Sequence, residues 1–309
     1  MKKIIVWDLF GGGQNSVYHA LDHDKYDVYT FDITEPSHEH QYKLDLSQDN
    51  IIEIFKQYPK PDIIVASPLC QSFSCVLQMK GGGTCFWKWD NDKQMLVERS
   101  VEEFERLKSG FTRNKKAETQ LYVKRLGEKC INNTLLLIEV YHPKYWYIEN
   151  PKNSLMWKFI YHNHYLDFYA LDWQHRFSNE ASLGKYGYLI TKPTIFLSNV
   201  KMDLKKGRIP KIYHTETRNG VKYYVLNDDV KTSDKQAYTT PGFVLHALPS
   251  TIKARTCKGN SGMGGMDFVN RQPRLSQTNH QVVEQVSESG YISQIPPSLI
   301  QDIFSYFVV

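Results

Sequence analysis

Short, mostly apolar runs alternate along the first half of the chain with segments that have helical spacing. Several of the runs end at a carboxylate, a glycine turn or a proline. Strands that are apolar throughout and are separated by helices are typical of a parallel sheet with helices on both faces. The expected strands cover residues 4–7, 28–31, 63–66 and 145–148, and the expected helices cover residues 15–21, 50–57 and 117–141.

Residues 75–115 break this rhythm. They hold three successive glycines, Gly81 to Gly83, followed by Trp87, Trp89 and a charged run. Long segments without periodic structure inside a compact domain are often functional. We interpret this stretch as a long functional loop that leads into the helix predicted to follow.

The remainder of the chain divides into two parts. From about residue 201 to 284, basic, glycine-containing and polar residues dominate and the periodicity is poor. A final amphipathic helix then begins, with Pro296 or Pro297 at its first position. We therefore expect one domain made of residues 1–200 plus 285–309, and a second, smaller domain at 201–284.

The composition fits a globular protein and restricts its function only slightly. The 309 residues are 41% hydrophobic and 23% charged, with a net charge of +5. This mild positive charge permits a polyanionic partner without requiring one. The five cysteines have no paired spacing, and no constellation of ligands indicates a metal site. No apolar segment approaches the length of a membrane span, so we expect a cytoplasmic protein that needs neither a membrane nor a metal.

Chemically useful groups follow the predicted strands. Asp8 precedes a glycine turn at residues 11–13, Asp32 ends the second strand, and Glu149 ends a later one. Ligands of open parallel sheets bind at the carboxyl ends of the strands. The glycines would let the backbone approach a ligand closely, and Asp32 could accept the two hydroxyls of a ribose. A nucleoside cofactor is indicated, and the absence of a GxGxxG fingerprint argues against NAD.

Cys70 follows another predicted strand, just beyond the rigid Pro68. This position suits a nucleophile, although a lone cysteine is more often a buried structural residue. Its neighbours favour the nucleophile. The segment 67–74 resembles the Pro-Cys-Gln-x-Phe-Ser motif of the cytosine-5 DNA methyltransferase family, with matches at Cys70, Gln71, Phe73 and Ser74.

The resemblance extends to the cofactor motifs of that family. The run Asp8-Leu9-Phe10-Gly11-Gly12 is similar to its glycine motif, and Asp32 matches its ribose-binding carboxylate. Asp45 stands where an acidic residue is expected to meet the adenine. The resemblance thus implies that S-adenosylmethionine is the cofactor. The implied cofactor-binding residues are Asp8, Phe10, Gly11, Gly12, Asp32, Asp45 and Pro68.

Later motifs occur in the family's order. Glu149-Asn150 matches a Glu–Asn pair, and Tyr186-Gly187 is followed by Lys192 and Thr194 at the spacing of a basic motif. Pro296-Pro297 is similar to a C-terminal motif that returns to the cofactor site. The runs at 149–155 and 192–194 are most like those of phage and viral members.

The resemblance implies a fold and a reaction. The fold is a doubly wound, mostly parallel α/β sheet of the S-adenosylmethionine-dependent methyltransferase type, with a smaller target-recognition domain at 201–284. The reaction is transfer of a methyl group to carbon 5 of a cytosine flipped out of double-stranded DNA. Cys70 would attack carbon 6, Glu149 would hold ring nitrogen 3 and the amino group, and Lys192 would supply a cation.

One segment of the implied machinery has two readings. In this family a mobile loop closes over the flipped base, and Gly81 to Gly83 with Trp87 and Trp89 stand at its position. The alternative is a plain surface loop with packed tryptophans.

The sequence departs from the family pattern at several positions. Leu69 replaces the proline before the cysteine, and Lys192 and Thr194 replace two arginines. Lysine keeps the charge but loses the bidentate fork of arginine. Arg176 is a candidate substitute for the missing arginine. These changes leave room for an enzyme with an altered substrate.

Two other functions remain open. One is an enzyme that methylates an exocyclic amino group, although such enzymes carry an aromatic residue where this chain has Cys70. The other is a non-catalytic DNA-binding protein that retains the fold. The target sequence, the oligomeric state and any partner restriction enzyme are not indicated by the sequence.

Overall fold

The computed structural model describes most of the first 208 residues and three later segments. The described ranges are 2–11, 15–73, 86–107, 116–163, 176–186, 192–208, 213–218, 221–226, 252–254 and 295–307. Of the predicted residues, Gly12, Ser74, Gly81 to Gly83 and Gly187 lie outside these ranges.

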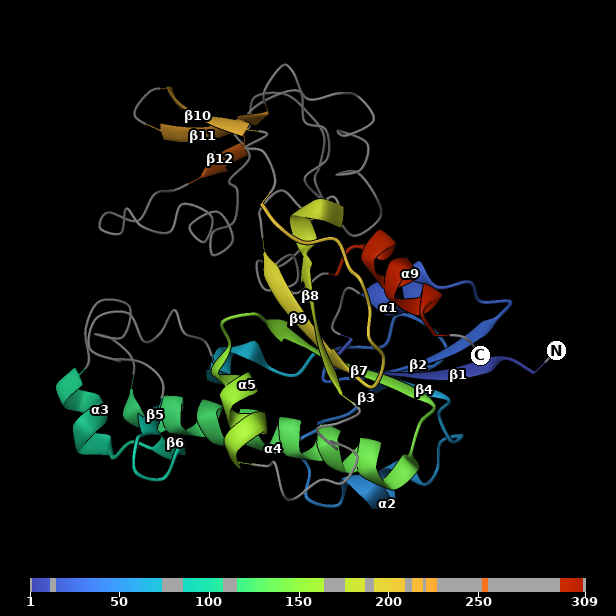
Figure 1. Ribbon diagram of the computed structural model, residues 1–309, viewed down its shortest axis with the longest axis horizontal. Helices are drawn as coiled ribbons and strands as arrows, with labels where there is room; N and C mark the ends of the chain where they lie inside the picture. Colours follow the sequence, from blue (N-terminus) through green and yellow to red (C-terminus); the bar gives the residue numbers. More distant parts are fainter. Residues whose placement is uncertain are drawn as a thin grey trace.

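One large sheet is the centre of the molecule (Figure 1). In the described part of the chain it has seven strands in the order β3-β2-β1-β4-β7-β9-β8. Neighbouring strands from β3 to β7 are parallel. The strands are β1 (Ile4–Leu9), β2 (Tyr26–Asp32), β3 (Gln41–Lys43), β4 (Ile63–Ala66), β7 (Tyr145–Pro151), β8 (Phe177–Ser182) and β9 (Pro193–Ser198).

One strand, β9, runs opposite to the others near one edge of the sheet. β9 is antiparallel to both β7 and β8, so β8 runs in the same direction as the parallel strands. The prediction of a doubly wound, mostly parallel α/β sheet is therefore confirmed. β7 is longer than its predicted four residues, because it continues through Glu149 to Pro151.

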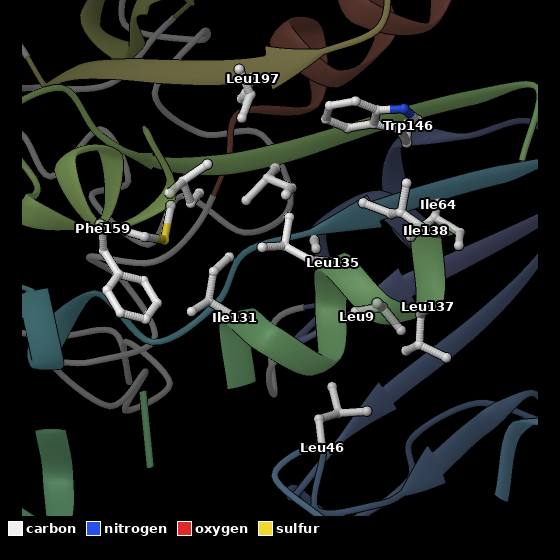
Figure 2. Packing of buried hydrophobic residues seen from close by; sticks show 14 of the residues in the cluster. Leu9, Leu46, Ile64, Ile131, Leu135, Leu137, Ile138, Trp146, Phe159 and Leu197 are labelled. Carbon is white, nitrogen blue, oxygen red and sulfur yellow. The ribbon is translucent and has the colours of Figure 1, made fainter. Parts of the chain in front are cut away.

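Helices cover both faces of the sheet, and each face has its own apolar cluster. α2 (Ile51–Phe55) and α4 (Ala117–Tyr141) pack on one face, where Trp7 and Leu9 point. Figure 2 shows Ile131, Leu135 and Ile138 of α4 directed at this face. α1 (Ser16–Ala20) and α9 (Pro297–Ser305) pack together on the other face. Alternate residues of β1 thus enter opposite cores.

Helices α1 and α9, which lie near the two ends of the sequence, pack in the same apolar cluster. Leu299, Ile300, Ile303 and Phe304 of α9 are buried, and Pro297 occupies the first turn, where a missing backbone N–H costs nothing. Gln301 donates from Nε2 to the Ala20 carbonyl at 3.1 Å. The C-terminal helix therefore packs against α1 on this face of the sheet.

The long helix has the limits that its apolar spacing predicts. α4 covers Ala117–Tyr141, and the following residue, His142, has a left-handed φ of 45° that ends the helix. Its N–H still donates to the Ile138 carbonyl.

Part of the segment interpreted as a long loop is regular. β5 (Trp87–Asp90) and β6 (Met95–Glu98) form an antiparallel hairpin, followed by α3 (Val101–Leu107). The Asp90 carboxylate accepts from the N–H groups of Asp92 and Lys93, which closes the turn. The short strands and polar tip of this hairpin obscured its pattern in the sequence.

The region predicted as a second domain is described only in part. β10 (Tyr213–Arg218), β11 (Val221–Leu226) and β12 (Ile252–Ala254) form a separate antiparallel sheet. Before it, Met202 and Leu204 are buried in the α1–α9 face of the main domain, which therefore extends beyond residue 200. Among the described residues, no helix is long and apolar enough to cross a membrane.

Candidate active site

The strand order creates a switch point between β1 and β4. From β1 the chain moves outward to β2 and β3, and from β4 it moves outward in the opposite direction to β7. Ligands of doubly wound sheets bind beside the carboxyl ends of the strands at such a point. The segments that follow β1 and β4 here begin at Phe10 and Ser67, so both predicted motifs lie at this position.

The turn after β1 requires a residue without a side chain and an unusual backbone conformation. Phe10 has a positive φ of 65° and donates its N–H to the Phe31 carbonyl at 2.9 Å. A β-carbon on Gly11 would lie 2.5 Å from Cγ2 of Thr30 and 2.6 Å from Oδ2 of Asp8. Glycine is therefore required at position 11, because any side chain would collide with β1 and β2.

The Asp8 carboxyl group is buried beneath this turn. Its side chain is 3% exposed, and its Oδ2 atom has no hydrogen-bond partner among the described residues. Burial, reinforced by the nearby negative charge of Asp32, raises the pKa of Asp8 to about 8. Burial therefore favours the protonated form of Asp8.

Two further predicted cofactor residues lie at the last position of β2 and just beyond the end of β3. Asp32 is half-buried, and one carboxylate oxygen accepts from the Thr34 N–H at 2.9 Å. Asp45 is exposed, and its Oδ1 accepts from both N–H and Oγ of Ser47 at 2.9 and 2.7 Å. A carboxylate has about four acceptor positions, so Asp45 can accept from a ligand as well as from Ser47.

The predicted nucleophile begins a short 3-10 turn, η1 (Cys70–Phe73), after β4. Asn150 donates from Nδ2 to the Pro68 carbonyl at 2.9 Å, which connects the start of this segment to β7. Ser72 donates from Oγ to the Val123 carbonyl of α4 at 2.7 Å. One buried and one partly buried hydrogen bond therefore hold the Cys70 turn between β7 and α4.

Close packing of helix α4 also fixes this turn. A β-carbon on Gly127 would lie 2.0 Å from Oγ and 2.3 Å from the β-carbon of Ser72. Phe73 is buried and stacks on Trp87 at a centroid distance of 5.8 Å. The turn is anchored on one side by a glycine contact and on the other by aromatic packing.

Cys70, Glu149 and Lys192 lie within electrostatic range of one another. Cys70 is at the surface, but surrounding protein atoms desolvate its thiol and raise its pKa. The charge of Lys192 acts to lower that pKa, and the charge of Glu149 acts to raise it. A reactive thiolate at this position therefore depends on the cation.

The sheet registers explain this convergence. Ala66, the last residue of β4, pairs with Ile148 of β7, so Glu149 follows at the same edge. Pro151 pairs with Thr194 of the antiparallel β9, which brings the preceding Lys192 to that edge. Burial raises the pKa of Glu149, while Lys192 and a hydrogen bond from the Ser67 side chain oppose the rise.

Arg176 lies elsewhere. It directly precedes β8, whose first residue, Phe177, pairs with Ser198 at the far end of β9 from Lys192. Its guanidinium group is buried over the Tyr161 ring, 4.8 Å from the centroid. Of the two cations considered from the sequence, Lys192 is the one that acts on Cys70.

The two tryptophans predicted near the loop differ in environment. Trp87 is 2% exposed and packs against Phe73, with the Lys124 ammonium 4.2 Å from its ring centroid. Trp89 is only half-buried and contacts His162 edge-on. For Trp87 this arrangement favours the reading of a packed core residue.

Some residues of the site had a weaker signal in the sequence. Gly127 interrupts a strong helical pattern, and an isolated helix glycine often marks close packing. Within the described part of the chain the buried Tyr147 hydroxyl has no partner, although its place in an apolar strand indicates only a core residue. In the described ranges no group of three or more His, Cys, Asp or Glu residues could hold a metal ion.

Neither a known protein family nor a curated protein matches the sequence. Solved structures do match. One, described as a DNA modification methyltransferase encoded within an E. coli prophage, is 15% identical with a TM-score of 0.36, and the match covers 74% of this chain and 62% of that one. The S. pombe Dnmt2 methyltransferase is 12% identical with a TM-score of 0.35, covering 65% and 52%.

A DNMT2 variant from Spodoptera frugiperda is 14% identical with a TM-score of 0.34, and the match covers 68% of this chain and 56% of that one. The present chain thus spans between 52% and 62% of the length of these three proteins. Each of these three similarities concerns the fold only.

Proposed function

We propose that the protein is an S-adenosylmethionine-dependent DNA methyltransferase that methylates carbon 5 of cytosine, with Cys70 as nucleophile. The main support is that a cysteine, a carboxyl group and a lysine from three separate elements act on one another at the carboxyl edge of the sheet. This is the arrangement that attack on a protonatable pyrimidine ring requires.

The residues at the switch point fit a cationic nucleoside cofactor. Gly11 lets the turn lie directly on β1 and β2, and among the described residues Asp8 has a buried oxygen without a partner. Asp32 would accept from the ribose hydroxyls, and Asp45 would accept from the adenine amino group. S-adenosylmethionine supplies an electrophilic methyl group when bound there.

The chemistry of carbon 5 explains the three catalytic groups. The Cys70 thiolate adds to carbon 6 of the cytosine, which makes carbon 5 nucleophilic enough to take the methyl group. A base or water then removes the proton from carbon 5, and the Cys70 sulfur leaves with its bonding electrons. The ring has to be outside the base stack for these steps, so a flipped base is part of the proposal.

Glu149 and Lys192 control the charges during this addition. Because burial raises the pKa of Glu149, its carboxyl group can hold a proton and donate it to ring nitrogen 3 as negative charge develops there. Lys192 stabilises the Cys70 thiolate before the attack. Glu149 therefore acts on the cytosine ring, and Lys192 acts on the attacking sulfur.

The position of the transferred methyl group tests this function. Duplex DNA is incubated with the protein and methyl-labelled cofactor, digested to nucleosides and analysed by mass spectrometry. The proposal expects labelled 5-methylcytosine from the native protein and none from Cys70→Ala. A label on an exocyclic amino group would contradict it and support the rival enzyme. Absence of any label on DNA of diverse sequence would favour a non-catalytic protein.

A further inference from the structure

Tyr186 connects segments that are far apart in the sequence. It ends a short 3-10 turn, η6 (Leu183–Tyr186), in the connection between β8 and β9. Its hydroxyl donates to Oδ2 of Asp302 in α9 at 2.6 Å and accepts from the Lys205 N–H at 2.8 Å. Its carbonyl accepts from Oγ of Ser298, also in α9, at 3.2 Å. The side chain and the backbone of Tyr186 are therefore both fixed to the C-terminal helix.

The bond between Tyr186 and Asp302 is of a strong kind. Tyr186 is 7% exposed. Burial, the bond to Asp302 and the nearby Tyr306 raise the pKa of Tyr186, and the bond from the Lys205 N–H opposes the rise. The hydroxyl therefore keeps its proton and donates it to a carboxylate. Such charge-assisted hydrogen bonds are short and about twice as strong as neutral ones.

The connection that contains Tyr186 ends at Lys192, the cation of the candidate site. Leu183, the first residue of η6, donates its N–H to the Lys192 carbonyl at 3.2 Å. Ser182 pairs with Pro193, so the ends of β8 and β9 meet beside this bond. The backbone of Lys192 is thus attached to the same turn that α9 holds through Tyr186.

The segment after β9 contacts the same turn. The Ser182 N–H donates to the Lys205 carbonyl at 2.9 Å, and the Ser182 Oγ accepts from the Gly207 N–H at 3.0 Å. Because the Lys205 N–H also bonds to the Tyr186 hydroxyl, Lys205 contacts both the end of β8 and the end of η6. The Tyr186 hydroxyl is therefore the group through which α9 and this segment both hold the turn.

We propose that Tyr186 and Asp302 are positioning residues that hold Lys192 within range of Cys70. The inference rests on the proposed function, in which Lys192 stabilises the attacking thiolate, and it assigns part of that task to the C-terminal helix. The energy between two charges falls as their distance grows, so a displaced Lys192 stabilises the thiolate less. Tyr186 and Asp302 act through the backbone of η6 rather than on the reacting atoms.

Tyr186→Phe isolates this role because it removes one hydroxyl, keeps the ring and changes no charge. A change in thiolate formation at Cys70 must then come from movement of charges that are already present. These are Lys192, which acts to lower the pKa of Cys70, and Glu149, which acts to raise it. Asp302→Ala breaks the same hydrogen bond from its other end.

Tyr306, at the C-terminal end of α9, provides a matched control. Its hydroxyl donates to the Asp203 carbonyl at 3.2 Å and accepts from the Asp203 N–H at 3.3 Å. These bonds link α9 to the segment after β9, and neither of them reaches η6. Tyr306→Phe therefore loses the same chemical group as Tyr186→Phe without releasing the turn that holds Lys192.

The rate at which iodoacetamide alkylates Cys70 measures thiolate formation in the folded full chain. Peptide mass spectrometry follows this rate from about pH 7 to 10. Tyr186→Phe should move the profile to higher pH and slow the reaction about two- to threefold at pH 8, less than Lys192→Gln does. Asp302→Ala should slow it similarly, and the double variant should be no slower than either single one. Tyr306→Phe should keep the native profile.

A test in the Lys192→Gln background shows whether the effect passes through the lysine. There Tyr186→Phe should cause no further slowing, because the charge that it displaces is already gone. A further slowing, or an equal shift in Tyr306→Phe, would overturn the positioning role.

Failure of this inference differs from failure of the proposed function. A native profile in Tyr186→Phe beside a shifted one in Lys192→Gln would overturn the role of Tyr186 and leave the proposed function intact. An unchanged profile in Lys192→Gln itself would remove Lys192 from the proposed mechanism, and the inference with it.

Discussion

At the scale of single residues, the site depends on a thiol that its surroundings keep protonated. Desolvation and the charge of Glu149 raise the pKa of Cys70, and Lys192 opposes them. Only the thiolate is a nucleophile, so the reactive fraction of Cys70 grows as the pH rises toward its pKa. The cation beside it thus controls how much of the protein is reactive near neutral pH.

Loss of this cation should move the pH profile of thiol reactivity. In Lys192→Gln the pKa of Cys70 rises further, so alkylation of Cys70 by iodoacetamide should slow several-fold at pH 8 and require a higher pH to recover. Lys192→Arg keeps the charge and is the matched control. Peptide mass spectrometry measures the rate at Cys70. An unchanged profile in Lys192→Gln would show that this lysine does not act on the thiol.

Burial of Asp8 predicts an unusual dependence of stability on pH. The folded pKa is about 8 and the ordinary value is 3.8, so the folded state holds the proton more tightly. The free energy of unfolding should therefore fall as the pH rises between these values, by up to about 1.4 kcal/mol per unit. Asp8→Asn removes this loss. Its thermal stability relative to the native protein should improve from pH 5 to pH 8, and an equal difference at both pH values would contradict the burial argument.

At the scale of elements, the Cys70 turn is held from two sides. The Asn150 bond to Pro68 fixes it to β7, and the contact of Gly127 with Ser72 fixes it to α4. The hydrogen bond stabilises one end of the turn, and the absence of a side chain at position 127 permits the other contact. Changes at either place should affect the nucleophile without touching it.

The Asn150 bond can be compared with an equivalent bond far from the site. Asn133 donates from Nδ2 to the carbonyls of Leu46 and Gln48 at 2.8 and 2.9 Å. Asn150→Ala and Asn133→Ala should each cost about 1–2 kcal/mol of unfolding free energy, measured by denaturant titration. Only Asn150→Ala should slow methyl transfer, by roughly tenfold or more. Equal activity in the two variants would remove the positioning role of Asn150.

The glycine contact makes a helix-favouring substitution harmful. Gly127→Ala would normally stabilise a helix by about 0.5–1 kcal/mol, but here the new methyl group collides with Ser72. We expect a net loss of about 1–3 kcal/mol in chemical unfolding. Adding Ser72→Gly removes the opposing atoms and should recover part of the loss. A single variant as stable as the native protein would show that η1 does not pack this closely on α4.

At the scale of the whole molecule, the parallel core could be predicted from the sequence because its signals are local. The apolar runs of β1 and β4 each predict a strand, and the long stretch of helical spacing in α4 predicts a helix, without information from the rest of the chain. The hairpin at 87–98 could not be predicted, because two four-residue strands around a polar turn show too little alternation of apolar and polar residues. Met202 and Leu204, beyond the predicted limit at residue 200, are buried in the same cluster as residues of α1 and α9, which are distant in the sequence.

Some residues of the candidate site could likewise be predicted from local sequence, and others could not. Cys70 and Glu149 stood out by residue type at strand ends, and their shared edge follows from the parallel order of β4 and β7. The choice between Lys192 and Arg176 required the register of β9, which no local pattern contains.

The covalent bond between Cys70 and a cytosine tests the account most directly. In duplex DNA containing 5-fluorocytosine, fluorine replaces the hydrogen that would leave carbon 5 as a proton. The adduct that forms after methyl transfer therefore cannot break down. With S-adenosylmethionine present, the native protein should form a complex that survives denaturation, with the DNA attached to the peptide containing Cys70. Cys70→Ala should form none. A native protein that transfers methyl groups to ordinary DNA without forming this adduct would contradict the account.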